Sequence, residues 1–262
     1  MKLTAIIIVL FMSLGFNISA QEAVQPLTQL ADSAYNKDSY TQAIQLYKQA
    51  LEENGRNAEL YYNLGNAYYR TGNVAQAVIN YERALRIDPS MKDARANLQF
   101  VNSRLEDKPE DNNSVLTRAH NSVVSAMSAN AWAWTAFVVF VLLCGAAAVY
   151  IFSSNIAMRK AGFFGGMILI VLTIYFVVVA AHAANRIDDH SEAVVTVPST
   201  LLNSQPRQPK QTEKVVPLHE GTKVEIVDSV ATPDDPVSPR WYKIRINGSN
   251  EAWLRSTDVE RI

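Results

Sequence analysis

The sequence predicts a multi-domain membrane protein with three parts: an α-helical solenoid, a transmembrane helical hairpin and a small all-β barrel. A pattern of about 34 residues begins near Val24 and again near Ala58, which indicates stacked helical repeats. Two long stretches without a charged residue follow. From Glu192 onwards, short segments rich in β-branched and aromatic residues are separated by turn residues. Each observation therefore assigns one part of the chain to its own class of structure.

Large and small residues recur at matching positions of the two repeats. Ala31, Ala43, Tyr47 and Ala50 of the first copy return in the second as Gly65, Ala77, Tyr81 and Ala84. Small residues let paired helices approach closely, and the tyrosines fill the space between neighbouring pairs. This pattern resembles the tetratricopeptide repeat (TPR), whose closing proline is matched by Pro89. The first copy departs from it at Leu27, Ala34 and Gly55, as a terminal capping copy would. A helical hairpin with chance matches is the alternative.

A capping helix is expected after the second repeat. Ala94, Leu98, Val101 and Leu105 recur at helical spacing, with polar residues elsewhere on the same helix. Such a helix would cover the apolar end of the array. The repeats and their cap therefore occupy residues 24–105, and residues 106–130 form a linker.

The TPR resemblance implies a concave groove that binds other proteins. By the helix register of that family, the candidate binding residues are Tyr35, Tyr62, Asn63, Asn66, Tyr69 and Asn97, on one face with Thr28, Asp32, Asp93 and Phe100. Asn63 matches an asparagine used by TPR domains that clamp a peptide carboxylate. Thr28, Asp93 and Asn97 occupy the basic positions of that clamp, so the clamp is not expected. Tyrosine and asparagine suit polar protein surfaces, because they combine contact area with adaptable hydrogen bonds. Alternatively, some of these tyrosines pack within the array.

The N-terminus has the features of a secretory signal. Lys2 precedes the apolar run Leu3 to Phe16, and Ile18-Ser19-Ala20 ends on a small residue before Gln21. We expect residues 1–20 to be a cleaved signal peptide that exports the repeats. An uncleaved anchor is the alternative.

Residues 131–153 and 162–184 are predicted transmembrane helices. Neither contains a charged residue, and each exceeds the roughly 20 residues needed to cross the hydrocarbon core. The turn between them, residues 154–161, carries only the positive charges of Arg159 and Lys160, which places it in the cytoplasm. Cys144, the only cysteine, lies in the first span and has no partner for a disulfide within the chain. The repeats and the C-terminal part are then both extracytoplasmic.

Residues 192–262 are predicted to form a small all-β barrel. Asn247-Gly248 is a strong hairpin signal, because both residues tolerate positive φ. Glu220 to Ile226, Trp241 to Ile244 and Ala252 to Leu254 resemble the bacterial SH3 (SH3b) domain in their order, although Ala252 stands where a glycine is usual.

Trp241 is the candidate ligand-binding residue of this barrel. Strand alternation places Tyr242, Ile244 and Ile246 on one face, so that Trp241 should be exposed on the other. The SH3 resemblance implies that such a tryptophan lines the ligand groove. The alternative is that it covers the barrel edge.

Catalysis, a cofactor and nucleic-acid binding are not expected. The net charge is −1, and there is no basic patch with interleaved aromatic residues. No nucleophile motif or phosphate loop is present. His182, Asp188, Asp189 and His190 offer metal ligands in principle, but their spacing matches no metal motif, and polar residues at a helix exit are the simpler interpretation. We therefore predict a non-enzymatic chain without a metal site.

The whole order of segments resembles the BatE-type TPR proteins of bacterial aerotolerance operons. This resemblance implies an inner-membrane location with the TPR and SH3b domains in the periplasm. It also implies membrane-bound von Willebrand factor A-type partners and a role in oxidative-stress tolerance. We expect a scaffold that holds protein partners in the TPR groove. The alternative is a cell-wall sensor that binds peptidoglycan through the SH3b domain.

Overall fold

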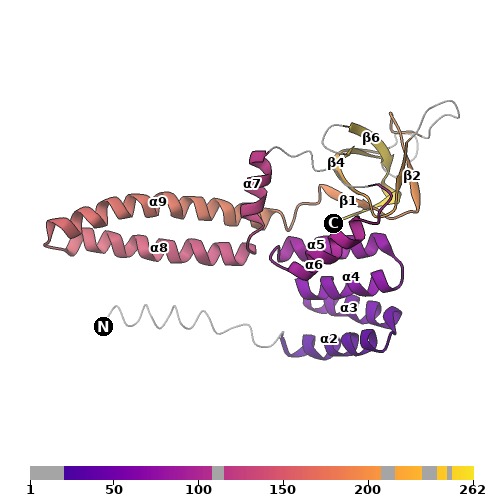
Figure 1. Ribbon diagram of the computed structural model, residues 1–262, viewed down its shortest axis with the longest axis horizontal. Coiled ribbons are helices and arrows are strands. Elements are labelled where there is room, and N and C mark those ends of the chain that lie inside the picture. The colour runs from indigo at the N-terminus through magenta and orange to yellow at the C-terminus, as the bar shows by residue number, and fades with distance from the viewer. Residues whose placement is uncertain (1–20, 108–114, 208–215, 232–240, 247–249) are drawn as a thin grey trace.

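The computed structural model describes residues 21–107, 115–207, 216–231, 241–246 and 250–262. The predicted signal peptide at residues 1–20 and the predicted turn at Asn247-Gly248 lie outside the described residues. A stack of short helices, a long helical hairpin and a β-domain can be distinguished (Figure 1).

The helical array contains α2 (Gln21–Asn36), α3 (Tyr40–Asn54), α4 (Ala58–Arg70), α5 (Val74–Ile87) and α6 (Lys92–Asn102). Asparagines begin the two helices of the second repeat: the side chain of Asn57 accepts from the backbone N–H of Leu60 at 3.0 Å, and that of Asn73 from Gln76 at 3.1 Å. Each bond satisfies a backbone donor that the first turn of a helix leaves unpaired. The helices stack as consecutive antiparallel pairs (Figure 1).

The core of the array combines small and large residues as the repeat pattern predicts. Ala43, Ala77 and Ala84 are fully buried, and Tyr47 and Tyr81 are buried beside them. A Cβ atom at Gly65 would lie 2.8 Å from the ring of Tyr81, so a larger residue at that position would force the two helices apart. The expectation of close helix pairing is therefore confirmed.

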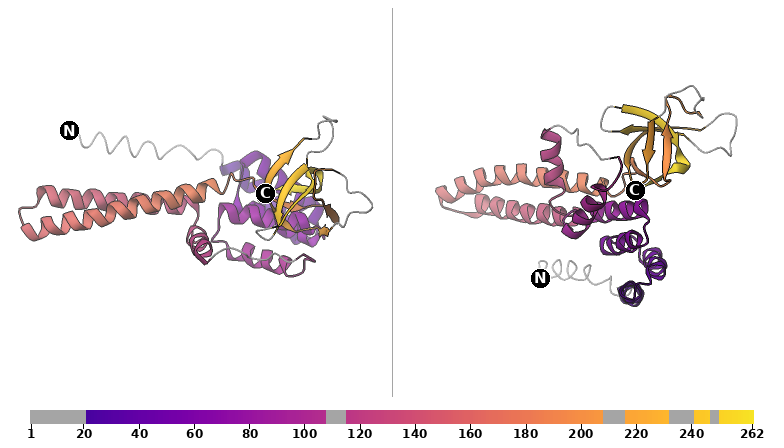
Figure 2. Two further views of the ribbon diagram at one scale, coloured as in Figure 1. Left: turned by 90° about the horizontal axis from the view of Figure 1, so that it is seen from above. Right: turned by 45° about the vertical axis from the view of Figure 1, so that its right-hand side comes forward.

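Helices α8 (Ala129–Phe152) and α9 (Ile156–Asn185) form a hairpin that projects from the rest of the molecule (Figures 1 and 2). Both are long and apolar enough to cross a membrane, judged by length and composition. Helix α7 (Val115–Val124) packs against their base, where the indole N–H of Trp132 donates to the carbonyl oxygen of Val124 at 3.2 Å. The Trp132 ring stacks on Phe176 of α9, with 5.7 Å between centroids.

In the described part of the β-domain, the strands are β1 (Glu192–Val195), β2 (Ser199–Leu202), β3 (Val216–His219), β4 (Lys223–Val230), β5 (Trp241–Ile246), β6 (Asn250–Arg255) and β7 (Val259–Arg261). Five of them form an antiparallel sheet in the order β6-β5-β4-β1-β7, and β2 pairs with β3. A short 3-10 turn, η1 (Ser256–Asp258), precedes β7. Val224, Ile244 and Leu254 lie at the centre of the hydrophobic core of the β-domain.

The β-domain packs directly against α5 (Figures 1 and 2). Val194 of β1 and Ile262 join a buried cluster with Val78 and Ile79 of α5 and Leu105 after the cap. The helical array and the β-domain thus share one hydrophobic core, a contact that the sequence pattern did not predict.

Candidate functional site

The candidate partner-binding face is carried by helices α2, α4 and α6. Tyr35 lies on α2 and Asn97 on α6, while Tyr62, Asn63, Asn66 and Tyr69 lie on α4. All six side chains are half-buried, so each keeps part of its surface in contact with solvent. Their hydrogen bonds and ring contacts show which of them hold the helices together and which have side-chain groups accessible to a partner.

Asn66 and Asn97 are brought together by a buried tyrosine. The hydroxyl of Tyr81 donates to Oδ1 of Asn66 at 2.8 Å, and Nδ2 of Asn97 donates to the same oxygen at 2.9 Å. Burial raises the pKa of Tyr81, which stays a neutral donor. The equivalent bond of the first repeat runs from the Tyr47 hydroxyl to Oδ1 of Asp32 at 2.6 Å. Asn66 and Asn97 therefore fix α4 against α5 and α6 and support the binding face.

An arginine and two aromatic rings form a partly exposed cluster on this face. The rings of Tyr69 and Phe100 meet edge to face with centroids 5.9 Å apart. The guanidinium of Arg104 lies 3.8 Å from the Phe100 centroid and donates to the Tyr69 hydroxyl at 3.0 Å. Phe100 is 45% exposed. Exposed aromatic and arginine side chains held in fixed positions are typical anchors of protein interfaces.

The remaining predicted residues differ in how far contacts within the array already occupy their side chains. Tyr35 packs edge to face on Tyr40, with centroids 5.2 Å apart, and Tyr62 packs on Tyr81 at 6.2 Å. Within the part of the chain that the structure describes, the Asn63 side chain makes no hydrogen bond, so its amide is available to a partner.

Arg104, Tyr40 and Arg70 border this face but were not among the predicted binding residues. The sequence contained a signal for Arg104, which follows Phe100 by one helical turn. The Arg70 guanidinium lies 4.7 Å from the Tyr40 centroid. These two residues come from different repeats, so no local spacing could have paired them.

The predicted exposure of Trp241 is wrong. Trp241 is 5% exposed and buried in the β-domain, and the next buried residue on β5 is Ile244 rather than Lys243. Strict alternation therefore fails along this strand. The neighbouring strand β4 carries an irregularity between Ile226 and Asp228, and such bulges increase the local twist and reorient side chains. Trp241 offers little surface to a ligand, which fits the alternative interpretation that it covers the barrel edge.

The polar residues in the last turn of α9 and just after it make other contacts. Within the described residues, no group of three or more His, Cys, Asp or Glu side chains is placed to hold a metal ion. The carboxylate of Asp188 pairs with Arg56 of the array at 2.7 Å. The ring of His182 packs edge to face on His120 of α7, with centroids 5.1 Å apart.

The comparison with known proteins agrees with the helical array. Residues 28–92 match the tetratricopeptide repeat family, so the chain contains tetratricopeptide repeats. It is similar to the Protein SGT1 homolog of Oryza sativa subsp. japonica, at 34% identity over 88 residues. That match covers 34% of this chain and 24% of the rice protein, so the chain spans about a quarter of the curated relative. TPR domains are typically non-enzymatic modules that bind other proteins.

Proposed function

We propose that this chain is a non-enzymatic scaffold, anchored in a membrane, that holds a protein partner on the face of α2, α4 and α6. The observation that carries this proposal is the exposed cluster of Tyr69, Phe100 and Arg104, which lies on an array with tetratricopeptide repeats. The hydrogen bonds of Asn66 fix the helices behind this cluster, so little ordering is required when a partner binds.

The membrane anchor of this proposal is the hairpin of α8 and α9. Arg159 and Lys160 lie near the start of α9, beside the turn of the hairpin, whereas the array and the β-domain both lie at the opposite end (Figure 1). The positive-inside rule then assigns the turn to the cytoplasm and both other parts to the periplasmic side of a bacterial inner membrane. Tethering raises the effective concentration of a partner that is held in the same membrane.

The β-domain of this proposal is an SH3b-type barrel. Its topology supports this assignment. The β2-β3 hairpin lies between β1 and β4 in the chain, while β1 and β4 are neighbours in the sheet, and a 3-10 turn precedes β7. With this assignment, the order of segments corresponds to a BatE-type protein. Its partners would be membrane-bound von Willebrand factor A-type proteins, in a complex linked to oxidative-stress tolerance.

The test is crosslinking in intact bacterial membranes. A photoreactive residue replaces Tyr62 on the proposed face, and a control chain carries it at Glu53, an exposed position on α3. We expect Tyr62 to capture a discrete membrane protein that Glu53 does not. Equal adducts at both positions, or none at Tyr62, would contradict the scaffold.

Peptidoglycan binding through the β-domain is the weaker candidate. The residue expected to carry it, Trp241, is buried. Binding of the purified protein to sacculi that persists after Tyr62→Ala and Tyr69→Ala, with no protein captured at Tyr62, would favour the cell-wall sensor instead.

A further inference from the structure

A cleft separate from the face of α2, α4 and α6 lies where α3, α4, α5, the exit of α9 and strand β7 meet. It consists of two pockets, of about 530 and 310 Å³, which share Tyr61 and Arg83. We call this the junction cleft. Pockets of this size are typical of ligand sites. Tyr61 lines both pockets, whereas the adjacent Tyr62 lines neither, so two neighbouring residues report on different surfaces.

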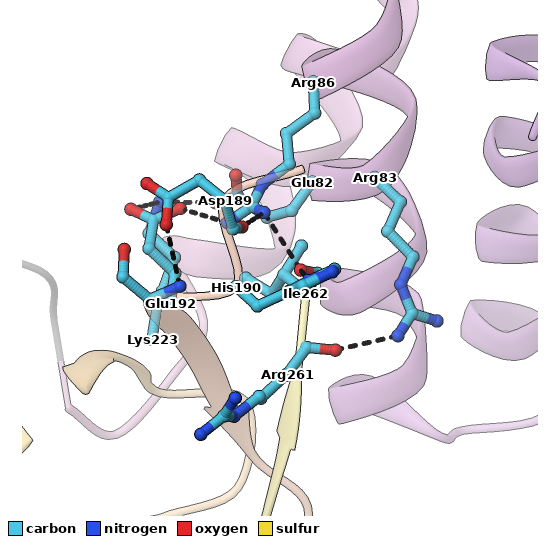
Figure 3. Close-up of polar contacts among 10 residues, drawn as sticks. Glu82, Arg83, Arg86, Asp189, His190, Glu192, Lys223, Arg261 and Ile262 are labelled. Atoms are coloured by element: carbon cyan, nitrogen blue, oxygen red, sulfur yellow. Dashed lines mark hydrogen bonds and ion pairs between the residues drawn. The ribbon is translucent and has the colours of Figure 1, made fainter. Parts of the chain in front are cut away.

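Docking of the β-domain builds one wall of this cleft. Glu260 of β7 accepts from Gln76 at 2.6 Å and pairs with Arg83 at 2.9 Å, both on α5. Arg83 also donates to the carbonyl oxygen of Arg261 at 2.8 Å (Figure 3). These hydrogen bonds and the ion pair fix this wall of the cleft.

Basic side chains dominate the lining of the cleft. Lys48, Arg56, Arg83 and Arg86 line it, against the acidic residues Glu52 and Glu260. Beside the cleft, Asp188 pairs with Arg56 and Glu192 pairs with Arg86. The Arg261 guanidinium is turned away toward Tyr242, at 4.9 Å from the ring centroid (Figure 3). Because Lys48 makes no ion pair among the described residues and Arg56 and Arg83 keep unused N–H groups, the lining favours an anionic ligand.

Arg56 and Arg83 retain unused donors. The acceptors of Arg56, Ile187 and Asp188, both contact Nη1, and those of Arg83 both contact Nη2. Within the described part of the chain, the other N–H groups of each guanidinium have no acceptor. Because the planar guanidinium presents five N–H donors, each arginine can still bind a carboxylate.

Asn80 contributes an unpaired acceptor at the floor of the smaller pocket. It is 1% exposed, and its Nδ2 donates to the carbonyl oxygen of Gln76 at 2.7 Å. Its Oδ1 is buried and has no hydrogen-bond partner among the described residues. A buried carbonyl oxygen without a donor costs stability, so a partner that brings an N–H group would satisfy it.

We propose that the junction cleft binds an extended acidic segment of a partner polypeptide. Its carboxylates contact Arg56 and Arg83, an N–H group satisfies Asn80, and its apolar side chains pack on Leu51 and Ile87. A polypeptide fits better than a phospholipid headgroup, because the cleft extends from the exit of α9 across to α3. It also combines arginine N–H donors for carboxylates with the Asn80 oxygen, which accepts from an N–H group. This site is separate from the face of α2, α4 and α6 and does not depend on its function.

The test measures peptide binding to the full-length protein in phosphatidylcholine nanodiscs. The probe is a short fluorescein-labelled peptide of alternating aspartate and leucine, followed by anisotropy, with a lysine-leucine peptide as its counterpart. We expect the acidic peptide to bind and the lysine-leucine peptide not to bind. The double variant Lys48→Gln with Arg56→Gln should weaken binding roughly tenfold. These cations lie outside the pairs that dock the β-domain.

Two further variants separate binding from folding. Lys37→Gln with Lys92→Gln removes the same charge at exposed positions elsewhere on the array and should leave binding unchanged. Asp188→Asn removes the ion-pair partner of Arg56 and should strengthen binding several-fold. A merely structural role of Arg56 would give the opposite result for Asp188→Asn.

Three outcomes would overturn this proposal. Equal binding of the acidic and basic peptides would show that the cleft does not select anions. Displacement of the acidic peptide by phosphatidylglycerol vesicles, but not by inorganic phosphate, would assign the cleft to lipid. Binding that is lost in Tyr62→Ala and retained in the Lys48/Arg56 variant would move the peptide to the other face. The crosslinking test at Tyr62 is independent of this one, because Tyr62 does not line the junction cleft. Either proposal can therefore fail while the other holds.

Discussion

The guanidinium of Arg86 lies 2.8 Å from the carboxylate of Glu192, and this ion pair joins the helical array to the β-domain (Figure 3). The Arg86 side chain is only 8% exposed, and it also donates to backbone oxygens of Ile262, at 2.9 Å, and Asp189. Lys223 pairs with both Glu192, at 3.3 Å, and Glu82 of α5, at 3.0 Å. Charged residues of α5 and of the β-domain thus neutralise each other at the interface between the two domains.

The first prediction concerns the pH dependence of this pair. Burial alone would raise the pKa of Glu192, but the charges of Lys223 and Arg86 outweigh it, and the pKa lies below its usual 4.5. The stability that Glu192 contributes is therefore fully present above about pH 4.5 and is lost as the pH falls through the lowered folded pKa. At neutral pH we expect Glu192→Gln to cost about 1–2 kcal/mol, because the carboxylate is partly exposed.

Thermal unfolding of the wild type and Glu192→Gln, followed between pH 3 and 8, measures this effect. The difference in Tm should shrink in acid. The charge of Glu82 holds the pKa of Lys223 above its usual range, so its contribution persists at high pH and is lost only as the pH rises through that raised value. A difference in Tm that is constant across the acid range would contradict the role of Glu192.

The second prediction concerns the close approach of the two domains at Gly221. Its φ is +86°, and a Cβ atom there would lie 2.7 Å from Cδ2 of Leu105 and 3.3 Å from Cγ1 of Val74. Gly221→Ala therefore adds a collision between domains to the strain of a left-handed backbone, for a total of about 2–3 kcal/mol. Urea unfolding of the full chain in detergent measures it.

Gly72 offers a matched control. Its φ is +81°, and a Cβ atom there would meet nothing within 4 Å, so Gly72→Ala should cost only about 1 kcal/mol. Equal losses for the two variants would mean that the domains do not approach closely at Gly221.

The third prediction concerns Trp241. Because this side chain is buried, Trp241→Ala should cost about 3–5 kcal/mol and lower the hydrogen-exchange protection of β4, β5 and β6. Val227→Ala, at an exposed position of β4, should change protection by less than about 0.5 kcal/mol. Normal protection in Trp241→Ala together with lost sacculus binding would restore Trp241 as a ligand residue.

The fourth prediction concerns the hydroxyl of Tyr81. Tyr81→Phe removes the bond to Asn66 at 2.8 Å but leaves Asn97 as a donor to the same oxygen, so we expect a loss of about 1 kcal/mol. Tyr62→Phe is the control, because the Tyr62 hydroxyl has no hydrogen-bond partner among the described residues. The free energy of unfolding should stay unchanged for that variant. An equal loss in both would exclude the specific role of the Tyr81 bond.

Much of the local structure was predictable because periodicity reports which side of an element is buried. The spacing of Ala43, Tyr47, Ala77 and Tyr81 predicted the packing of the helical array, and these residues are buried together. The binding face was predicted less completely. The six residues lie on the helices expected for them, but Asn66 and Asn97 are tied to Tyr81, and Arg104 was missed.

The sequence by itself determined where helical repeats, long apolar helices and short strands form, because these depend on residues a few positions apart. The tertiary structure alone decided which surfaces meet. Arg86 and Glu192 are 106 positions apart, and on α5 the charged residues Glu82, Arg83 and Arg86 read as a solvated helix face. Local periodicity cannot show that a distant sheet covers that face, nor that Trp241 is buried where strict strand alternation predicts exposure. The docking of the β-domain, and with it the junction cleft, follows from long-range complementarity of charge and shape.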